Sequence, residues 1–115
     1  MKKYLEYDGG LYIGGNIILA SVEYEQDLKW DDAKKYCKSL NIEGYKDWRM
    51  PTRREMKQIH EHLKEINYEK YKIYHNYYWT DTEESEYYAW VENMKYIAMS
   101  CFKEYIHTVR PIRTV

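Results

Sequence analysis

Residues 44–55 read GYKDWRMPTRRE, and this stretch separates two segments that have helical periodicity. Gly44 can adopt a positive φ, and Pro51 biases the residue before it toward an extended backbone. Thr52 and Glu55 have the spacing of a capping box, in which the threonine hydroxyl accepts from the Glu55 amide and the glutamate reaches back to the Thr52 amide. The stretch therefore predicts a loop that ends at the start of a helix.

Apolar residues recur at helical spacing on both sides of this loop. Upstream, the apolar face comprises Trp30, Ala33, Cys37 and Leu40. Downstream, it comprises Met56, Ile59, Leu63 and Ile66. We expect the second helix to run from about 53 to about 63, and the first to be capped by Asp27 or Asp31.

Strand signals occupy both ends of the chain. The expected strands are 4–5, 11–13 and 17–24 at the N-terminal end, then 77–80, 87–91, 96–102 and 105–109. Residues 67–76 are expected to form a connector, 81–86 an acidic loop, and 93–95 a hairpin turn. Strands, two helices and strands in this order predict one α+β domain over 1–115, with the two helices packed on a twisted antiparallel sheet.

The composition is that of a folded domain whose core is rich in aromatic residues. The chain has 115 residues, and its 15 Tyr and 4 Trp compensate for a low content of aliphatic side chains. A net charge of −1 excludes a strongly basic nucleic-acid clamp, and no apolar run is long enough to span a membrane. Without a signal-peptide pattern, the chain is expected in the cytoplasm.

Five short motifs resemble those of a known family. They are WxxAxxYCxxL over 30–40, GYxDWRxPTxxE over 44–55, YWTxT over 78–82, AW at 89–90 and VRPIR over 109–113. Their order is similar to that of the DUF1566 family, also called the Lcl C-terminal domain family. The resemblance implies a C-type-lectin-like fold, shared with formylglycine-generating enzymes and phage tropism determinants, in which the chain termini meet.

Most motif residues are expected to have structural roles. Trp48 can bury its ring while Asp47 and Arg49 tie the loop, because a guanidinium binds carboxylate or carbonyl oxygens bidentately. Arg110 and Arg113 are expected to bind the loop or a sheet end in the same way. The complete structural set is Trp30, Asp47, Trp48, Arg49, Pro51, Thr52, Trp79, Trp90, Arg110 and Arg113, with Trp30, Trp79 and Trp90 forming one aromatic core.

A tyrosine-rich connector beside an acidic segment is the candidate binding surface. Tyrosine suits such surfaces because it combines a rigid ring with a hydrogen-bonding hydroxyl. The alternative is that these rings lie half-buried along the edges of the sheet. The candidate residues are Tyr68, Tyr71, Tyr74, Tyr77, Tyr78, Asp81, Glu83 and Glu84.

Metal and nucleic-acid sites are not favoured by the sequence. His60 and His62 lie two residues apart, so a helix points them in different directions, and no cofactor is expected. The calcium-binding motifs of sugar-binding lectins are absent, although the 81–86 carboxylates could hold calcium. Residues 46–64 carry six basic and three acidic side chains, a face that is usually just solvated.

These observations predict a small non-enzymatic binding module that recognises a protein partner. It could be encoded by a phage or mobile element and act on a host protein. One alternative is a glycan- or receptor-binding adhesin, or a phage tail-type domain. Another is an oxidase similar to the formylglycine-generating enzymes, which use a reactive cysteine pair with copper. Cys37 and Cys101 could be neighbours in a lectin-like fold, free or paired, and the oligomeric state is left open.

Overall fold

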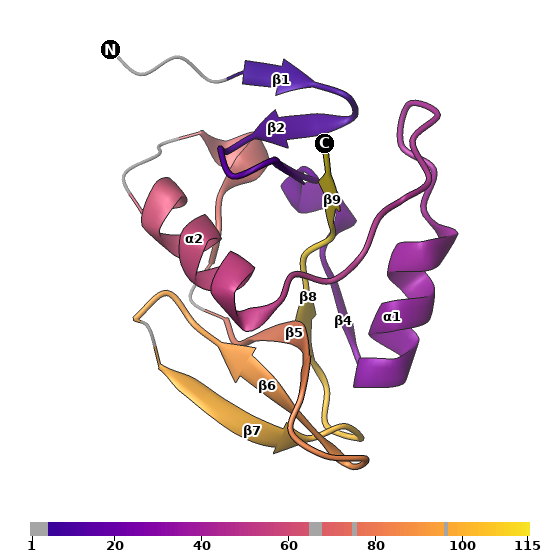
Figure 1. The fold of residues 1–115 in the computed structure, drawn as a ribbon, viewed down its shortest axis with the longest axis vertical. Coiled ribbons are helices and arrows are strands. Elements are labelled where there is room, and N and C mark those ends of the chain that lie inside the picture. The colour runs from indigo at the N-terminus through magenta and orange to yellow at the C-terminus, as the bar shows by residue number, and fades with distance from the viewer. Residues whose placement is uncertain (1–4, 65–67, 75, 96) are drawn as a thin grey trace.

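The computed structural model describes residues 5–64, 68–74, 76–95 and 97–115 (Figure 1). Expectations that fall on Tyr4, Ile66 and Tyr96 lie outside these residues. The first half contains β1 (Leu5–Tyr7), β2 (Gly10–Tyr12), β3 (Ile17–Leu19), η1 (Val22–Tyr24), β4 (Gln26–Leu28), α1 (Trp30–Ser39) and α2 (Arg53–Leu63). The second half contains η2 (Glu69–Tyr71), β5 (Tyr78–Glu83), β6 (Tyr88–Glu92), β7 (Ala98–Phe102), β8 (His107–Val109) and β9 (Ile112–Thr114).

The strands form two sheets, where the sequence predicted one. The first has the order β1-β2-β3-β9 and the second β4-β8-β5-β6-β7. Neighbouring strands are antiparallel, except that β5 and β8 are parallel. β3 near the N-terminus pairs with β9 at the C-terminus, so the two ends of the chain share one sheet. The architecture confirms the α+β prediction.

Several strand boundaries differ from the predicted ones. The expected strand at 17–24 ends at Leu19, and β4 and β9 were not predicted. Both missed strands are three residues long, too short to show the alternation on which the prediction depended. β5 continues to Glu83, so Asp81 and Glu83 belong to a strand and the expected acidic loop begins later.

The helices follow the predicted periodicity closely. α2 spans the predicted residues, and the capping box between Thr52 and Glu55 is confirmed. The predicted cap of α1 is wrong: Lys29 is the N-cap and makes no side-chain cap bond, while Asp27 lies in β4 and Asp31 in the first turn. Among the described residues, no helix is long and apolar enough to cross a membrane.

Buried side chains form three clusters around the two sheets. α2 packs Met56, Ile59 and Leu63 against the first sheet, and α1 packs Trp30, Ala33 and Cys37 against the second. The third cluster surrounds Trp48. Each amphipathic helix thus covers apolar strand residues that would otherwise face water.

The predicted single aromatic core is wrong in one member. Trp30 and Trp79 share a cluster, but Trp90 is only half-buried and lies outside it. Its neighbours Ala89 and Val91 point into that cluster, so strand alternation directs Trp90 to the opposite face. There the Arg53 guanidinium lies 4.0 Å from the centre of the Trp90 ring.

Candidate functional site

The loop between the helices is held by contacts within the chain. Trp48 is 2% exposed, and its indole Nε1 donates to the Tyr45 carbonyl at 2.9 Å. Arg49 donates two 2.7 Å hydrogen bonds to the two carboxylate oxygens of Glu55. The pKa of Glu55 is lowered chiefly by this guanidinium. One glutamate therefore closes the capping box and anchors the loop.

The same loop is bonded to the C-terminal strand. Arg49 and Ile112 exchange backbone hydrogen bonds of 2.8 and 2.9 Å. Arg113 donates from Nε to Asp47 at 2.8 Å, and its guanidinium lies over the Tyr45 ring. The pKa of Asp47 is lowered chiefly by that hydrogen bond. The expectation that Arg113 binds the loop is confirmed.

Arg110 joins segments from three parts of the chain while fully buried. Its Nε donates to the Ala20 carbonyl at 2.7 Å, and its Nη1 donates to Glu25 and to the Lys72 carbonyl, each at 2.9 Å. The Tyr78 hydroxyl donates to the same Glu25 carboxylate at 2.7 Å. Burial raises the pKa of Glu25, and its two donors oppose that rise. Tyr78 is therefore a core residue.

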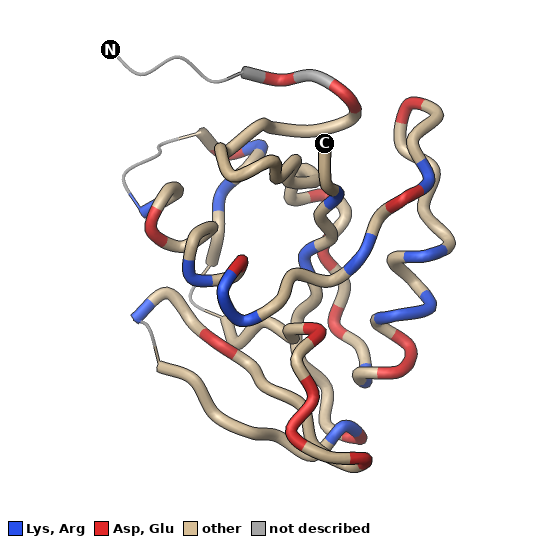
Figure 2. The backbone as a smooth tube through the Cα atoms, in the orientation of Figure 1, with Lys and Arg blue, Asp and Glu red and all other residues tan. Residues whose placement is uncertain are grey.

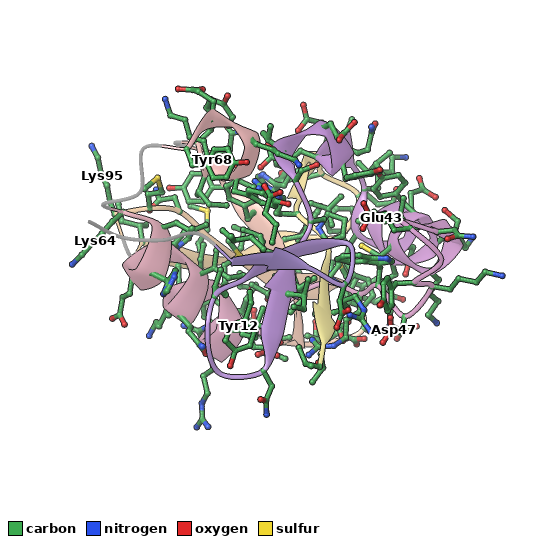
Figure 3. The ribbon with its side chains drawn as sticks, turned by 90° about the horizontal axis from the view of Figure 1, so that it is seen from above. Tyr12, Glu43, Asp47, Lys64, Tyr68 and Lys95 are labelled. Atoms are coloured by element: carbon green, nitrogen blue, oxygen red, sulfur yellow. The ribbon has the colours of Figure 1, made fainter. Side chains whose placement is uncertain are left out.

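The predicted tyrosine surface is wrong for two of its five tyrosines. Tyr71 and Tyr78 are buried in the first cluster, and burial raises the pKa of Tyr71 to about 12. Tyr77 is half-buried with its ring edge-on to His107, and the Tyr68 hydroxyl donates to Glu6 at 2.5 Å (Figure 3). Tyr74 is exposed. The alternative of half-buried tyrosines describes Tyr68 and Tyr77.

The acidic segment is separated from these tyrosines by the length of β5. Tyr78 begins this six-residue strand and Glu83 ends it, so their backbones are about 17 Å apart. Asp81 forms an ion pair with Lys34 at 3.7 Å, and Glu83 one with Lys103 at 3.3 Å. The predicted composite surface of tyrosines and carboxylates is therefore not contiguous.

Exposed and half-buried aromatic residues gather instead where β6 begins and β7 ends. We call Tyr88, Phe102 and Tyr105, which are linked by ring contacts and line one hollow, the aromatic face. The exposed Tyr87 and Ile106 adjoin it in the chain. Phe102 is edge-on to Tyr88 and to Tyr105, with 5.9 Å between ring centres in both pairs. Tyr105 is 62% exposed. A shallow hollow of about 510 Å³ is lined by Tyr88, Met99, Ser100, Cys101, Phe102 and Tyr105.

Carboxylates surround one side of the aromatic face. We call Glu83, Glu84, Glu86 and Glu104 the acidic rim; all four are exposed, and Figure 2 shows acidic positions grouped where β5 turns into β6. Lys103 lies among them, donates to the Glu86 carbonyl at 2.8 Å and lies over the Trp30 ring. Lys103 pairs with Glu83 at 3.3 Å and Lys29 with Glu104 at 3.1 Å, so four carboxylates and two cations leave the rim with a net negative charge.

Sequence reasoning missed the aromatic face because its residues were assigned to strands. Residues 105–109 were expected to form one strand, but β8 begins at His107. Tyr105 and Ile106 therefore lie in a turn, where the Tyr105 amide donates to the Phe102 carbonyl at 2.9 Å. Glu104 precedes these two apolar residues in the sequence, and this contrast was the available signal for an exposed turn.

The two cysteines are free and belong to the same buried cluster. Burial raises the pKa of Cys37 to about 12 and also raises the pKa of Cys101. Both thiols are therefore protonated near neutral pH, and a protonated thiol is a poor nucleophile and metal ligand. Within the described residues, no group of three or more metal-ligating side chains occurs.

The basic segment around α2 is partly engaged in internal contacts. Arg49 is bound to Glu55, and Arg53 lies between Trp90 and the buried Glu92 carboxylate. Burial raises the pKa of Glu92, and the Arg53 guanidinium opposes that rise. Two of the segment's cations are therefore committed to the fold.

A family comparison accounts for the motif loop and its partners. The Lcl C-terminal domain family model matches residues 15–113, and the chain belongs to this family, which is the DUF1566 family. The match includes both helices, the loop between them and the arginines that follow β8. A comparison with curated proteins finds no match.

Proposed function

We propose that this chain is a small non-enzymatic module that binds a protein partner through the aromatic face. The observation that carries the proposal is the cluster of exposed aromatic rings around an open hollow at the β6–β7 end. Contact residues that dominate protein interfaces are enriched in tyrosine and lie near apolar neighbours. The buried motif residues, by contrast, are occupied by contacts within the chain.

The acidic rim specifies the kind of partner. Charges at the edge of an interface set the association rate and disfavour partners of like charge, while central apolar contacts set the dissociation rate. A partner that fits this surface has an apolar patch bordered by Lys or Arg. Glu84 and Glu86 are exposed and lie beside Tyr87, so they are placed to meet such cations.

Site-specific photo-crosslinking tests the proposal. A photoreactive phenylalanine analogue is placed at Tyr105, and a matched control carries it at Arg54, an exposed position on α2. We expect one protein to be captured from position 105 and not from position 54. The captured protein is then purified, and its affinity for the native chain and the Tyr105→Ala variant is measured. Capture from position 54 alone would contradict the proposal.

A glycan is the second candidate ligand, because tyrosine rings around a shallow hollow can also stack on sugar rings. A glycan array with the purified chain, run with and without calcium, separates the two ligand classes. Binding to a sugar that is lost in Tyr105→Ala would favour the glycan or adhesin function over the protein partner.

The oxidase alternative receives less support from the thiols. A reactive pair needs accessible, easily ionised cysteines, whereas burial raises the pKa of both Cys37 and Cys101. Titration of the native chain with a thiol reagent tests this point. We expect slow labelling that becomes fast on unfolding, and rapid labelling of the native chain would revive the oxidase alternative.

We also propose that the fold is C-type-lectin-like. The support is the combination of two helices, mainly antiparallel sheets and the pairing of β3 with β9, which brings the terminal segments together. Determining an experimental structure and superposing it on lectin-like domains tests the proposal. The proposal would be contradicted if the strands of the second sheet were connected in a different order from those of lectin-like domains.

A further inference from the structure

β7 is an open edge of the second sheet. The sheet order ends at this strand, and among the described residues β6 is its one neighbouring strand (Figure 1). Its sequence, AMSCF over 98–102, contains no charged residue and no proline. Natural edge strands usually carry such residues, because an unprotected edge pairs with another strand.

The hydrogen-bond pattern shows which groups face outward from this edge. The Lys103 amide donates to the Tyr87 carbonyl at 2.8 Å, and the Asn93 amide donates to the Ile97 carbonyl at 3.0 Å. Because bonded and non-bonded pairs alternate in an antiparallel ladder, Met99 and Cys101 also direct their backbone groups toward β6. The backbone groups of Ala98 and Ser100 and the Phe102 amide consequently point away from the sheet, while the Phe102 carbonyl already accepts from the Tyr105 amide at 2.9 Å.

We propose that β7 pairs with β7 of a second copy of this chain, antiparallel about a two-fold axis at Ser100. Only outward-facing residues can pair across the edge, and this register brings together Ser100 with Ser100 and the amides of Phe102 with the backbone of Ala98. Ser100 lies opposite the partner's Ser100, and Ala98 lies opposite the partner's Phe102. The small side chain thus faces the large one, which suits close packing of the two strands.

The other face of the strand is also complementary to itself in this register. Met99 lies opposite the partner's Cys101, on the side of the sheet that contains the second buried cluster. Met99 is 41% exposed, so the second copy would cover an apolar side chain that now faces solvent. Apolar burial adds to the backbone hydrogen bonds in stabilising the dimer.

Charge favours antiparallel over parallel pairing. Antiparallel pairing places the start of one β7, which follows Lys95 in the chain, beside the end of the partner's β7, which precedes Glu104. Lys95 is exposed and projects away from the body of the molecule (Figure 3), and Glu104 is also exposed. The two-fold axis repeats this contact of opposite charges, whereas a parallel arrangement would bring Glu104 near its own copy.

The dimer and the proposed function share the β7 side of the hollow but can fail separately. Pairing uses the backbone edge of β7, which also lines the hollow, so a second copy would narrow it. Tyr88 and Phe102 project from one face of the sheet and are in ring contact there. Tyr88→Ala is expected to weaken binding of a protein partner while leaving the dimer mass unchanged, which distinguishes failure of one proposal from failure of the other.

The mass in solution tests the pairing, with light scattering during size-exclusion chromatography over a range of protein concentrations. We expect twice the 14.2 kDa chain mass at high concentration. Ser100→Pro removes the outward amide and leaves the bonds to β6 intact, so it should give a monomer with native circular dichroism. The matched Ser100→Thr variant retains the amide and should stay dimeric. A monomeric native chain, or a dimer that survives Ser100→Pro, would overturn the proposal.

Charge exchange tests the register and does not rely on proline being tolerated. Lys95→Glu and Glu104→Lys alone should each raise the dimer dissociation constant about tenfold, because the axis repeats the contact. The double variant should recover most of the native affinity. Equal effects of single and double variants would rule out this antiparallel register. Hydrogen exchange adds a local readout: the Ser100 amide should become protected only at dimer-forming concentrations.

Discussion

The loop at 47–55 and the β6–β7 end use similar residues in opposite ways. In the loop, Trp48 is buried, and Arg49 has a carboxylate partner within hydrogen-bond distance. At the β6–β7 end, Tyr105 and Ile106 face solvent beside exposed carboxylates. Polar side chains whose hydrogen-bond partners lie within the chain mark residues that maintain the fold. Exposed apolar residues mark a surface that is available to another molecule.

This contrast separates the family motif from the candidate binding site. The motif arginines, Arg49, Arg110 and Arg113, bind glutamate, aspartate and backbone carbonyls of the same chain. A match to the family model therefore reports on how the chain folds. The aromatic face lies outside the motif loop, so its ligand has to be inferred from its own chemistry.

The largest effect on stability is expected from Trp48→Ala. Removing this buried ring should lower the free energy of unfolding by about 3–5 kcal/mol, because it leaves a cavity that the loop cannot fill. The matched control is Tyr105→Ala, which removes an exposed ring and should change stability by less than about 0.5 kcal/mol. Urea denaturation of both variants measures the difference. Equal destabilisation would remove the distinction between the two regions.

Lowering the pH should reduce the free energy of unfolding through His60. This side chain is buried with neither ring nitrogen hydrogen-bonded among the described residues, and burial lowers its pKa to about 4. The unfolded chain binds this proton near pH 6.5, so stability should fall as the pH drops from 6.5 toward 4. The full contribution is about 3 kcal/mol.

A His60→Leu variant isolates that contribution. His107, whose pKa burial also lowers, acts in the same direction, while the raised pKa values of Glu25 and Glu92 act against it. These groups contribute equally to the pH dependence of the unfolding free energy in the native chain and in the variant. The difference between the two chains therefore reports His60 alone. Urea midpoints measured across this pH range should diverge, and parallel curves would show that His60 does not titrate as described.

The aromatic face should show its importance in binding and not in stability. For the partner identified by crosslinking, Tyr105→Ala should weaken binding by about 2 kcal/mol, mainly through faster dissociation. Glu84→Lys should mainly slow association and reduce its dependence on salt. Surface plasmon resonance at two ionic strengths measures both rates. A Tyr105 variant with native kinetics would move the contact away from this face.

The smallest effect is expected at the start of α2. Thr52→Ala should cost roughly 1 kcal/mol, because the Glu55 amide loses its side-chain acceptor. The comparison with Thr52→Ser, which retains a hydroxyl acceptor, isolates this bond. Thermal unfolding measured by circular dichroism should place the serine variant near the native chain, and an equal loss in both would point to the threonine methyl group instead.

Local patterns predicted the helices and the motif loop well because their determinants lie close together in sequence. The capping box spans the four residues from Thr52 to Glu55, and together with the helical spacing of the apolar residues it identified α2 over 53–63. Pairing between strands that are far apart in the sequence could not be predicted from local patterns. β4 is defined by pairing with β8, and nothing within Gln26–Leu28 signals that partner.

The candidate surface was mislocated for a related reason. Counting tyrosines along 68–78 could not show that Tyr78 reaches Glu25 and Arg110 in the interior. Proximity in sequence also failed for the tyrosines and carboxylates, since a strand between them carries them apart. Exposure depends on which face of a strand is covered, and that depends on elements far away in the chain.

The pairing of β3 with β9 also determines when the domain can fold. Ile17 lies beside Thr114, so the first sheet is incomplete until residues 112–114 have left the ribosome. Until then, the apolar residues of β3 lack the strand that shields their open side. Such distant pairing closes slowly, because the entropy of the intervening loop is lost before the contacts form. A chaperone that holds the emerging N-terminal hairpin would therefore raise the yield of native protein.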